Sequence, residues 1–243
     1  MKILETHNLS KHWGGVYAVE KLSIGFEQGK ITGIIGPNGS GKSTLTNLLT
    51  GIYAIDGGSA VIDGLRLKKV IAHQNPLFGI TRTFQEVRLF EQMTVLDNIL
   101  VVITEKSVFG ALFSKHNKLD EKKAEEALQK VGLWEKRHQL AINLSYGQRK
   151  LLEIARVLAM DAKIIFFDEP FAGLFKEMIK KVAGIMEEMR AQGKTLILIE
   201  HNMELIRKLC DYLYVMDEGK LLAEGKADKV LSERKVVEAY LGE

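Results

Sequence analysis

Residues 36–43 have the sequence GPNGSGKS, which fits the phosphate-loop pattern G-x-x-x-x-G-K-S/T. The residues before it, 31–35, are apolar and β-branched and predict a buried strand, whereas residues 43–50 predict the first turns of a helix. Strand, glycine-rich turn and helix form the context that this pattern needs to bind phosphate. A structural glycine turn is the alternative interpretation, and the flanking segments argue against it.

The chemistry of this loop depends on its backbone and on two side chains. Its glycines let backbone N–H groups close around phosphate oxygens, and the N-terminus of the following helix adds partial positive charge. Lys42 can reach the outer phosphates of a nucleotide, and the Ser43 hydroxyl can ligate Mg²⁺. The residues predicted to bind the nucleotide are Gly36, Asn38, Gly39, Ser40, Gly41, Lys42, Ser43 and Thr44. The loop predicts a nucleotide phosphate but does not say which reaction follows.

The composition is that of an ordinary globular protein. The 243 residues suffice to bury a core, either as one large domain or as one with an inserted subdomain. Hydrophobic residues make up 46% of the chain and the net charge is +3, a balance that argues against binding nucleic acid or an anionic membrane surface. No apolar run approaches the roughly 18 residues of a membrane-spanning helix, and the N-terminus has no signal-peptide pattern.

The single cysteine, Cys210, excludes an internal disulfide and suits a reducing compartment. Its apolar neighbours favour a small packed residue over a reactive thiol. We therefore expect a cytoplasmic protein whose role at a membrane would come through a partner.

The pattern along the chain predicts three regions. The first 65 residues combine half-buried antiparallel strands, at 3–9 and 22–27, and a further strand at 60–62 with the strand–loop–helix unit. Residues 90–160 carry helical patterns without strand signals. Strands then return with a helix between them, which predicts a parallel sheet buried on both faces. The expected helices are 95–104, 120–131, 146–160, 176–191 and 227–241, and the later strands are 163–167, 195–199 and a hairpin at 212–223.

Polar residues follow three of the predicted strands. Asp168 and Glu169 come directly after a buried strand, where one carboxylate can hold Mg²⁺ and its neighbour can orient or deprotonate an attacking water. Gln85 follows the strand-like residues 81–84 and offers a neutral oxygen ligand for a metal contact that forms and breaks. His201 follows the strand 195–199 and could hydrogen-bond a terminal phosphate. Taken singly, each has a plain alternative: acids that cap a strand, a surface glutamine, or a surface or packed histidine. The phosphate loop upstream favours the functional interpretation.

A second anion-binding surface stands 20 residues before the Asp168–Glu169 pair. It consists of Leu144, Ser145, Tyr146, Gly147 and Gln148 and opens a predicted helix. In isolation Ser145 would be a plain helix N-cap. Five features occur together and in this order along the chain: the phosphate loop, Gln85, this segment, the acidic pair and His201. On these features the chain resembles the ATP-binding subunit of an ABC transporter over nearly all of its length.

The resemblance implies roles for these residues. Residues 36–43 would be Walker A, and the acidic pair would end Walker B, with Asp168 on Mg²⁺ and Glu169 as general base. Gln85 would be the Q-loop residue, and His201 the switch histidine. The catalytic set would thus be Glu169, His201 and Gln85, and the Mg²⁺ ligands Ser43, Gln85 and Asp168. Trp13 matches the aromatic residue that stacks on adenine, although a core tryptophan is the alternative.

The resemblance also implies an architecture and partners. The expected fold is an α/β P-loop NTPase with a mostly parallel core sheet, an N-terminal antiparallel β subdomain and an inserted helical subdomain. Residues 1–243 would form one ABC ATPase domain, in which 1–87 and 161–243 make the nucleotide-binding core and 88–160 the helical signature subdomain. Two subunits would dimerise head to tail, with segment 144–148 acting in trans on the partner's ATP. Integral membrane permease subunits, and indirectly a solute-binding protein, would complete the assembly on the inner face of the cell membrane, without nucleic acid.

Further sequence features indicate which group of ABC ATPases the chain resembles. Residues 82–85, 87–90 and 93–95, with Tyr146 and the C-terminal segment 236–243, look like those of branched-chain amino acid importer ATPases. Urea or amide importer ATPases and the lipopolysaccharide-export ATPase share parts of these features and stay open as alternatives. A soluble ABC ATPase that works on DNA or ribosomes, and a regulatory subunit without useful turnover, are less favoured.

One departure from the family pattern follows Walker B. After Glu169 and Pro170 the family has a D-loop that ends in Asp or Asn, whereas residues 171–176 here read FAGLFK. Phe175 replaces the polar residue, and the segment is one residue short. We therefore expect the coupling between the two ATP sites of the dimer to differ at this position, with Walker B itself intact.

Overall fold

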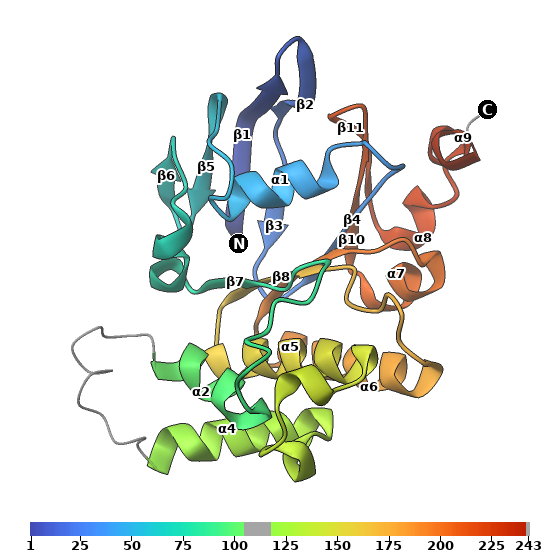
Figure 1. The fold of residues 1–243 in the computed structure, drawn as a ribbon. Coiled ribbons are helices and arrows are strands. Elements are labelled where there is room, and N and C mark those ends of the chain that lie inside the picture. The colour runs from blue at the N-terminus through green and yellow to red at the C-terminus, as the bar shows by residue number, and fades with distance from the viewer. Residues whose placement is uncertain (105–117, 242–243) are drawn as a thin grey trace. The chain divides into compact units, whose positions relative to one another are not determined.

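Figure 1 shows the fold of a computed structural model of the chain, which describes residues 1–104 and 118–241. The chain forms two compact units, each made of separate segments. The first unit comprises Met1–Arg82, Lys163–Glu169 and Glu187–Glu243, and the second comprises Thr83–Ala162 and Pro170–Met186. The second unit therefore takes in residues 83–87, 161–162 and 170–186 as well as the whole segment expected to form the helical subdomain, 88–160.

An antiparallel sheet makes up one layer of the first unit. The long strand β1 lies in its middle and pairs with β2, β3 and β5, while β6 extends the sheet beyond β5. The strands are β1 (Lys2–Trp13), β2 (Val16–Leu22), β3 (Gly25–Glu27), β5 (Gly57–Ile62) and β6 (Leu65–Leu67). The predicted antiparallel subdomain is confirmed, and β2 and β6 are strands that the sequence pattern did not indicate.

A second sheet of six strands, in the order β11-β10-β4-β9-β8-β7, carries the nucleotide-binding elements. Its strands from β10 to β7 are all parallel, and β11 pairs antiparallel to β10. The strands are β4 (Ile31–Ile35), β7 (Ile80–Arg82), β8 (Ile164–Asp168), β9 (Thr195–Ile199), β10 (Tyr212–Asp217) and β11 (Lys220–Gly225). Every residue of β4, β8 and β9 is buried, so the predicted parallel sheet covered on both faces is confirmed.

Helices of the first unit explain how both faces of this sheet are covered. Leu45 and Leu48 of α1 (Lys42–Leu49) join one apolar core with Ile34 of the parallel sheet and Phe26 of the antiparallel sheet. On the opposite face, α7 (Met203–Leu209) lies so close that a Cβ at Gly33 would come within 3.4 Å of Ile206 Cδ1. The sheet is therefore packed against a helix on each face, and because its strands β10 to β7 are parallel, their carboxyl ends lie at one edge.

The C-terminal segment corrects one prediction. A single helix over 227–241 was expected, but the chain forms α8 (Ala227–Val230) and α9 (Arg234–Leu241) instead. Between them the Ser232 hydroxyl donates a hydrogen bond to the Lys229 carbonyl at 2.8 Å. A short polar side chain that bonds to nearby backbone competes with helix propagation, which gives a physical reason for the break.

The second unit is mainly helical. It contains α2 (Val95–Thr104), α4 (Lys118–Val131), α5 (Tyr146–Met160) and most of α6 (Lys176–Ala191), with 3-10 turns η2 (Trp134–Lys136) and η3 (Ala141–Asn143). A further turn, η1 (Ala72–Phe78), precedes β7 in the first unit. The expected bounds of α2, α5 and α6 are confirmed, and α4 begins two residues earlier than expected. Within the described ranges, no helix combines the length and the apolar character required to cross a bilayer.

The thiol of Cys210 should be inert in the folded protein. The residue is buried at the end of α7, and burial, with a smaller contribution from the charge of Asp211, raises its pKa to about 12. Since each pKa unit lowers the thiolate fraction tenfold, we expect native protein at pH 8 to react with a disulfide reagent about a thousandfold more slowly than denatured protein. Stopped-flow labelling with and without guanidinium measures the ratio, and rapid stoichiometric labelling of native protein would contradict the burial.

Candidate nucleotide-binding site

The phosphate loop joins β4 to α1, as the sequence predicts. Two positions of the loop require glycine, because backbone atoms of other segments lie too close for a side chain. Gly36 has φ +152°, and a Cβ there would lie 2.0 Å from the Met216 carbonyl oxygen. Gly41 has φ +99°, and a Cβ there would lie 2.2 Å from the Ala18 carbonyl oxygen. Because both neighbours are backbone atoms that cannot swing aside, only glycine allows the loop to follow this path.

Lys42 is buried inside the loop. The residue is only 6% exposed. Its Nζ donates hydrogen bonds to the carbonyl oxygens of Gly36 at 2.8 Å and Pro37 at 2.9 Å. Burial lowers the pKa of Lys42, while the negative charges of Glu169 and Asp168 act in the opposite direction. The ammonium group is thus held close to where loop-bound phosphates would lie, by acceptors that a phosphate oxygen could replace.

The other loop residues leave an open anion-binding face. Asn38, Gly39 and Ser43 are exposed, Thr44 is half-buried and Ser40 is buried. The first turn of α1 has no side-chain cap and no acidic residue. N–H groups at the start of a helix that lack a side-chain acceptor are available to an anion, and the helix dipole favours it.

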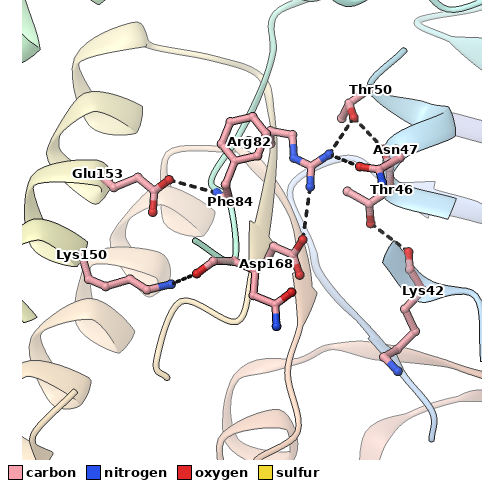
Figure 2. Close-up of polar contacts among 10 residues, drawn as sticks. Lys42, Thr46, Asn47, Thr50, Arg82, Phe84, Lys150, Glu153 and Asp168 are labelled. Atoms are coloured by element: carbon pink, nitrogen blue, oxygen red, sulfur yellow. Dashed lines mark hydrogen bonds and ion pairs between the residues drawn. The ribbon is translucent and has the colours of Figure 1, made fainter. Parts of the chain in front are cut away.

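Asp168 ends β8 in a buried ion pair with Arg82, the last residue of β7 (Figure 2). Arg82 Nη2 lies 3.2 Å from Asp168 Oδ2, and the two side chains are 10% and 7% exposed. The same guanidinium donates through Nη1 to Asn47 Oδ1 at 2.7 Å and to Thr50 Oγ1 at 3.1 Å, on and just after α1. Sequence reasoning placed Asp168 at this edge but gave Arg82 no role.

Glu169 and His201, predicted from separate strands, lie together. His201 Nε2 is 3.1 Å from Glu169 Oε1, and both side chains remain partly exposed. Glu169 has φ +46°, in the left-handed region where a non-glycine residue costs about 1–3 kcal/mol. Its amide donates to the Ile199 carbonyl at 3.0 Å, which ties this turn to the end of β9. Glu169 thus combines a strained backbone with a carboxylate that lies beside an imidazole, an arrangement that fits a residue acting on a bound substrate.

The backbone around His201 is fixed by its two neighbours. Glu200, which is buried, accepts hydrogen bonds from the amides of His201 at 2.8 Å and Asn202 at 3.1 Å. Asn202 in turn caps α7 by accepting from the amides of Glu204 and Leu205. The turn that presents the imidazole is therefore rigid, because a buried carboxylate and a helix cap hold it.

Trp13 lies at the end of β1 and is 52% exposed, so the alternative of a core tryptophan is wrong. Its ring meets Tyr53 edge-on, with centroids 5.2 Å apart, and Lys11 Nζ lies 4.5 Å from the ring centroid. These contacts orient the indole while leaving much of it accessible. An accessible and oriented aromatic face suits the stacking of an adenine ring.

The predicted Mg²⁺ ligands have suitable chemistry. In the first unit, Ser43 carries a hydroxyl oxygen and Asp168 a carboxylate oxygen, which are hard donors of the kind that Mg²⁺ prefers. The third predicted ligand, Gln85, belongs to the second unit and carries an amide oxygen. The described residues contain no cluster of three or more His, Cys, Asp or Glu that could hold a metal. The two donors of the first unit fit a magnesium ion that binds together with nucleotide phosphates rather than in a cage made only of protein.

In the second unit, the segment 144–148 forms the start of α5. Ser145 is its N-cap: its Oγ accepts from the Gln148 amide at 3.4 Å, and Gln148 Oε1 accepts from the Ser145 amide at 3.1 Å. The plain N-cap interpretation is therefore confirmed as a structural role. Tyr146 is exposed, Leu144 is buried, and a Cβ at Gly147 would lie 2.8 Å from Met178 Sδ. Since Ser145 Oγ serves the cap as an acceptor, its O–H can still donate to an anion.

The chain around Gln85 is held by two charged residues of α5 that sequence reasoning did not identify (Figure 2). Lys150 Nζ donates to the Gln85 carbonyl at 3.0 Å, and Glu153 Oε1 accepts from the Phe84 amide at 3.0 Å. Both side chains belong to buried residues, whereas Gln85 is exposed. One feature of the sequence could have pointed to them: Lys150 and Glu153 are charged and three positions apart, on the face of α5 whose other buried residues are mostly apolar.

The departure from the family pattern is visible in the structure of the second unit. Phe175, immediately before α6, is 78% exposed, while Phe171 is buried. Gly173 has φ +72°, and a Cβ there would lie 2.7 Å from Tyr146 Cε1, so this loop lies against the start of α5. A large apolar side chain thus stands in solvent where a polar one was expected.

Comparisons with known proteins agree with this geometry. A family model described as ABC transporter matches residues 19–172. The probable branched-chain amino acid transport ATP-binding protein LivG of Archaeoglobus fulgidus is 38% identical, with 100% of this chain and 96% of that protein covered. The high-affinity LivG protein of Escherichia coli is 36% identical, with 99% and 98% covered. The crystal structure of the ADP conformation of an ATP-binding cassette of an ABC transporter is 37% identical, covers 100% of both chains and has a TM-score of 0.87. With similarity along its full length, this chain belongs to the ABC transporter family, as a relative of its LivG ATP-binding proteins.

Proposed function

We propose that this protein is the ATP-hydrolysing motor subunit of a membrane importer, and that the imported solute is a branched-chain amino acid. One observation carries the proposal: the glycine loop with its buried Lys42 and the Glu169–His201 pair gather at one edge of the parallel sheet. The full-length likeness to branched-chain amino acid transport ATP-binding proteins supports the choice of solute.

ATP would bind with its phosphates in the loop. Lys42 Nζ would exchange the carbonyl oxygens of Gly36 and Pro37 for phosphate oxygens, which are charged and therefore form stronger hydrogen bonds. The amides at the start of α1 would face the same phosphates. The exposed ring of Trp13 would stack on adenine.

The chemical step would use Glu169 as the base that orients the attacking water and accepts its proton. His201, whose ring nitrogen already contacts the Glu169 carboxylate, would orient that carboxylate and reach the terminal phosphate. Ser43, Asp168 and Gln85 would hold Mg²⁺, which when bound neutralises charge on the phosphates. Phosphoryl transfer needs mainly positioning and charge stabilisation, and these residues supply both.

The segment 144–148 would complete the site of a second ATPase subunit in a head-to-tail dimer. Its contribution would be the Ser145 hydroxyl and the N-terminus of α5. Exposed Phe175 would lie near the dimer interface and alter communication between the two sites. Permease subunits would hold the dimer on the inner face of the membrane, and a solute-binding protein would deliver the solute.

The test is to reconstitute the protein with its co-purifying membrane partner and solute-binding protein in liposomes, and to measure phosphate release. We expect leucine, isoleucine or valine to raise ATP turnover several-fold, because solute delivery and ATPase closure are coupled in an importer. Lysine is the control solute and should leave the rate unchanged.

Three other outcomes would contradict the proposal in different ways. Stimulation by urea or an amide alone would keep the importer and replace the solute. Stimulation by lipopolysaccharide would make the protein an export motor. ATP binding without turnover, with or without the membrane partner, would make it a regulatory subunit.

A further inference from the structure

Arg82 stands at a junction of the chain. It is the last residue of β7, and it is also the last residue of the first unit before the chain enters the second. Three residues later comes Gln85, one of the proposed magnesium ligands. The proposed mechanism does not use Arg82, although its side chain is almost fully buried.

The guanidinium group of Arg82 joins two elements that carry the site. On one side, Nη1 donates to Asn47 Oδ1 at 2.7 Å and to Thr50 Oγ1 at 3.1 Å, which belong to α1 and its C-cap. On the other side, Nη2 donates to Asp168 Oδ2 at 3.2 Å, at the end of β8. Figure 2 shows the guanidinium between these groups, with one nitrogen directed at α1 and the other at Asp168.

These two elements each supply one proposed magnesium ligand. Ser43 is in the first turn of α1, and Asp168 ends β8. A magnesium ion requires near-ideal octahedral geometry with oxygens at about 2.0–2.1 Å, so a small shift of α1 along or across the sheet would separate the two ligands. The site therefore needs a contact that sets the position of α1 relative to the end of β8.

We propose that Arg82 is this positioning residue: it clamps α1 to Asp168, so that Ser43 and Asp168 face one Mg²⁺. The inference rests on the proposed ATPase function, because it assigns a role in the same site. In this role Arg82 would act without touching nucleotide or metal. It acts by fixing the helix through Asn47 and Thr50 and the carboxylate through Oδ2.

Arginine is required for this role because of its shape. Its planar fork presents donors in two directions from one rigid group, and here Nη1 and Nη2 serve acceptors on different elements. A lysine ammonium at the same position would keep the positive charge beside Asp168. It is a point charge on a flexible stem and would not hold both sides in one fixed geometry. The substitution Arg82→Lys thus separates positioning from charge.

The experiment measures the magnesium dependence of nucleotide binding, with a fluorescent ATP analogue as the probe. Affinity is measured in EDTA and then as Mg²⁺ is added, and Mn²⁺ binding followed by electron paramagnetic resonance provides a second readout. For Arg82→Lys we expect the Mg²⁺ concentration that gives half of the effect to rise at least tenfold. Affinity in EDTA should change less than twofold, because the phosphate loop is intact. Asn47→Ala, which removes only one contact on α1, should shift the midpoint in the same direction by a smaller factor.

Arg207→Lys is the matched control, since Arg207 also pairs with an aspartate at 3.3 Å, but the pair is exposed, with side chains 53% and 80% accessible. It should leave the magnesium midpoint unchanged. If thermal unfolding shows that Arg82→Lys does not fold, Asn47→Ala serves as the test. A raised magnesium midpoint in that variant would support the inference, and a wild-type midpoint would contradict it.

Two results would overturn the inference. A folded Arg82→Lys protein with a wild-type magnesium midpoint would show that the clamp is not needed. An equal loss of affinity in EDTA and in Mg²⁺ would show that Arg82 supports the phosphate loop and not the metal. By contrast, a wild-type protein that binds no nucleotide, or binds it independently of Mg²⁺, would contradict the proposed function itself.

Discussion

Replacing Glu169 by glutamine should slow ATP turnover by about 10²–10⁴-fold, the usual contribution of a general base, while ATP still binds. The glutamine side chain has nearly the same shape and can still hydrogen-bond His201, but its amide cannot accept the proton of the attacking water. ATP should therefore persist on the protein and favour the closed dimer. Phosphate release measures the turnover, and size-exclusion chromatography with ATP measures the dimer.

Glu5→Gln is the control for this variant, because Glu5 lies on β1 of the same unit and its only ion pair, within the described part of the chain, is a loose one to Lys2 at 3.9 Å. Its turnover should stay within twofold of wild type. If Glu169→Gln turned over ATP at the wild-type rate, the base would have to lie elsewhere.

The second large effect concerns Lys42, whose replacement by alanine should weaken ATP binding by about 10²–10⁴-fold. The estimate follows from two hydrogen bonds between charged groups, each worth about 1.5–3 kcal/mol, at about 1.4 kcal/mol for each factor of ten. Lys42→Met, which keeps most of the buried volume, should lose a similar factor, because the charge is responsible. Isothermal titration with ATP measures the affinity.

Lys163→Ala is the matched control, since Lys163 forms an exposed ion pair with Asp63 at 3.5 Å in the same unit. It should bind ATP as the wild type does. Unchanged affinity in Lys42→Ala would contradict the assignment of residues 36–43 as the phosphate-binding loop. The two experiments are complementary, because one variant should lose binding and the other should lose only turnover.

Much of the architecture follows from local patterns. The helix bounds of α5 and α6 and the strands β8 and β9 are predictable because helical periodicity and buried apolar runs depend on residues close together in the chain. The break between α8 and α9 was missed, since it depends on whether the Ser232 hydroxyl bonds to its own backbone. The hydrophobic pattern alone does not reveal that competition.

The candidate site, like the fold, was predictable from the sequence only in part. Gly36, Lys42, Asp168, Glu169 and His201 were named from the sequence, because each ends a buried strand or lies in the segment that follows one, and their order matches a known family. The contacts that orient them were not predictable. Lys150 and Glu153 carry no motif of their own, and their role appears only when α5 is seen to hold the chain at residues 84 and 85.

The sequence by itself determined the chemistry of this protein, because a phosphate loop and an acid pair after a buried strand need particular residue types at fixed spacings. The tertiary structure decided how these groups are held. Arg82 and Asp168 are 86 positions apart, and parallel pairing of β7 with β8 brings them within 3.2 Å. Glu169 and His201 meet because β8 and β9 are neighbours in the sheet. Such contacts depend on strand order and register, which are set by the packing of the whole core rather than by any local pattern.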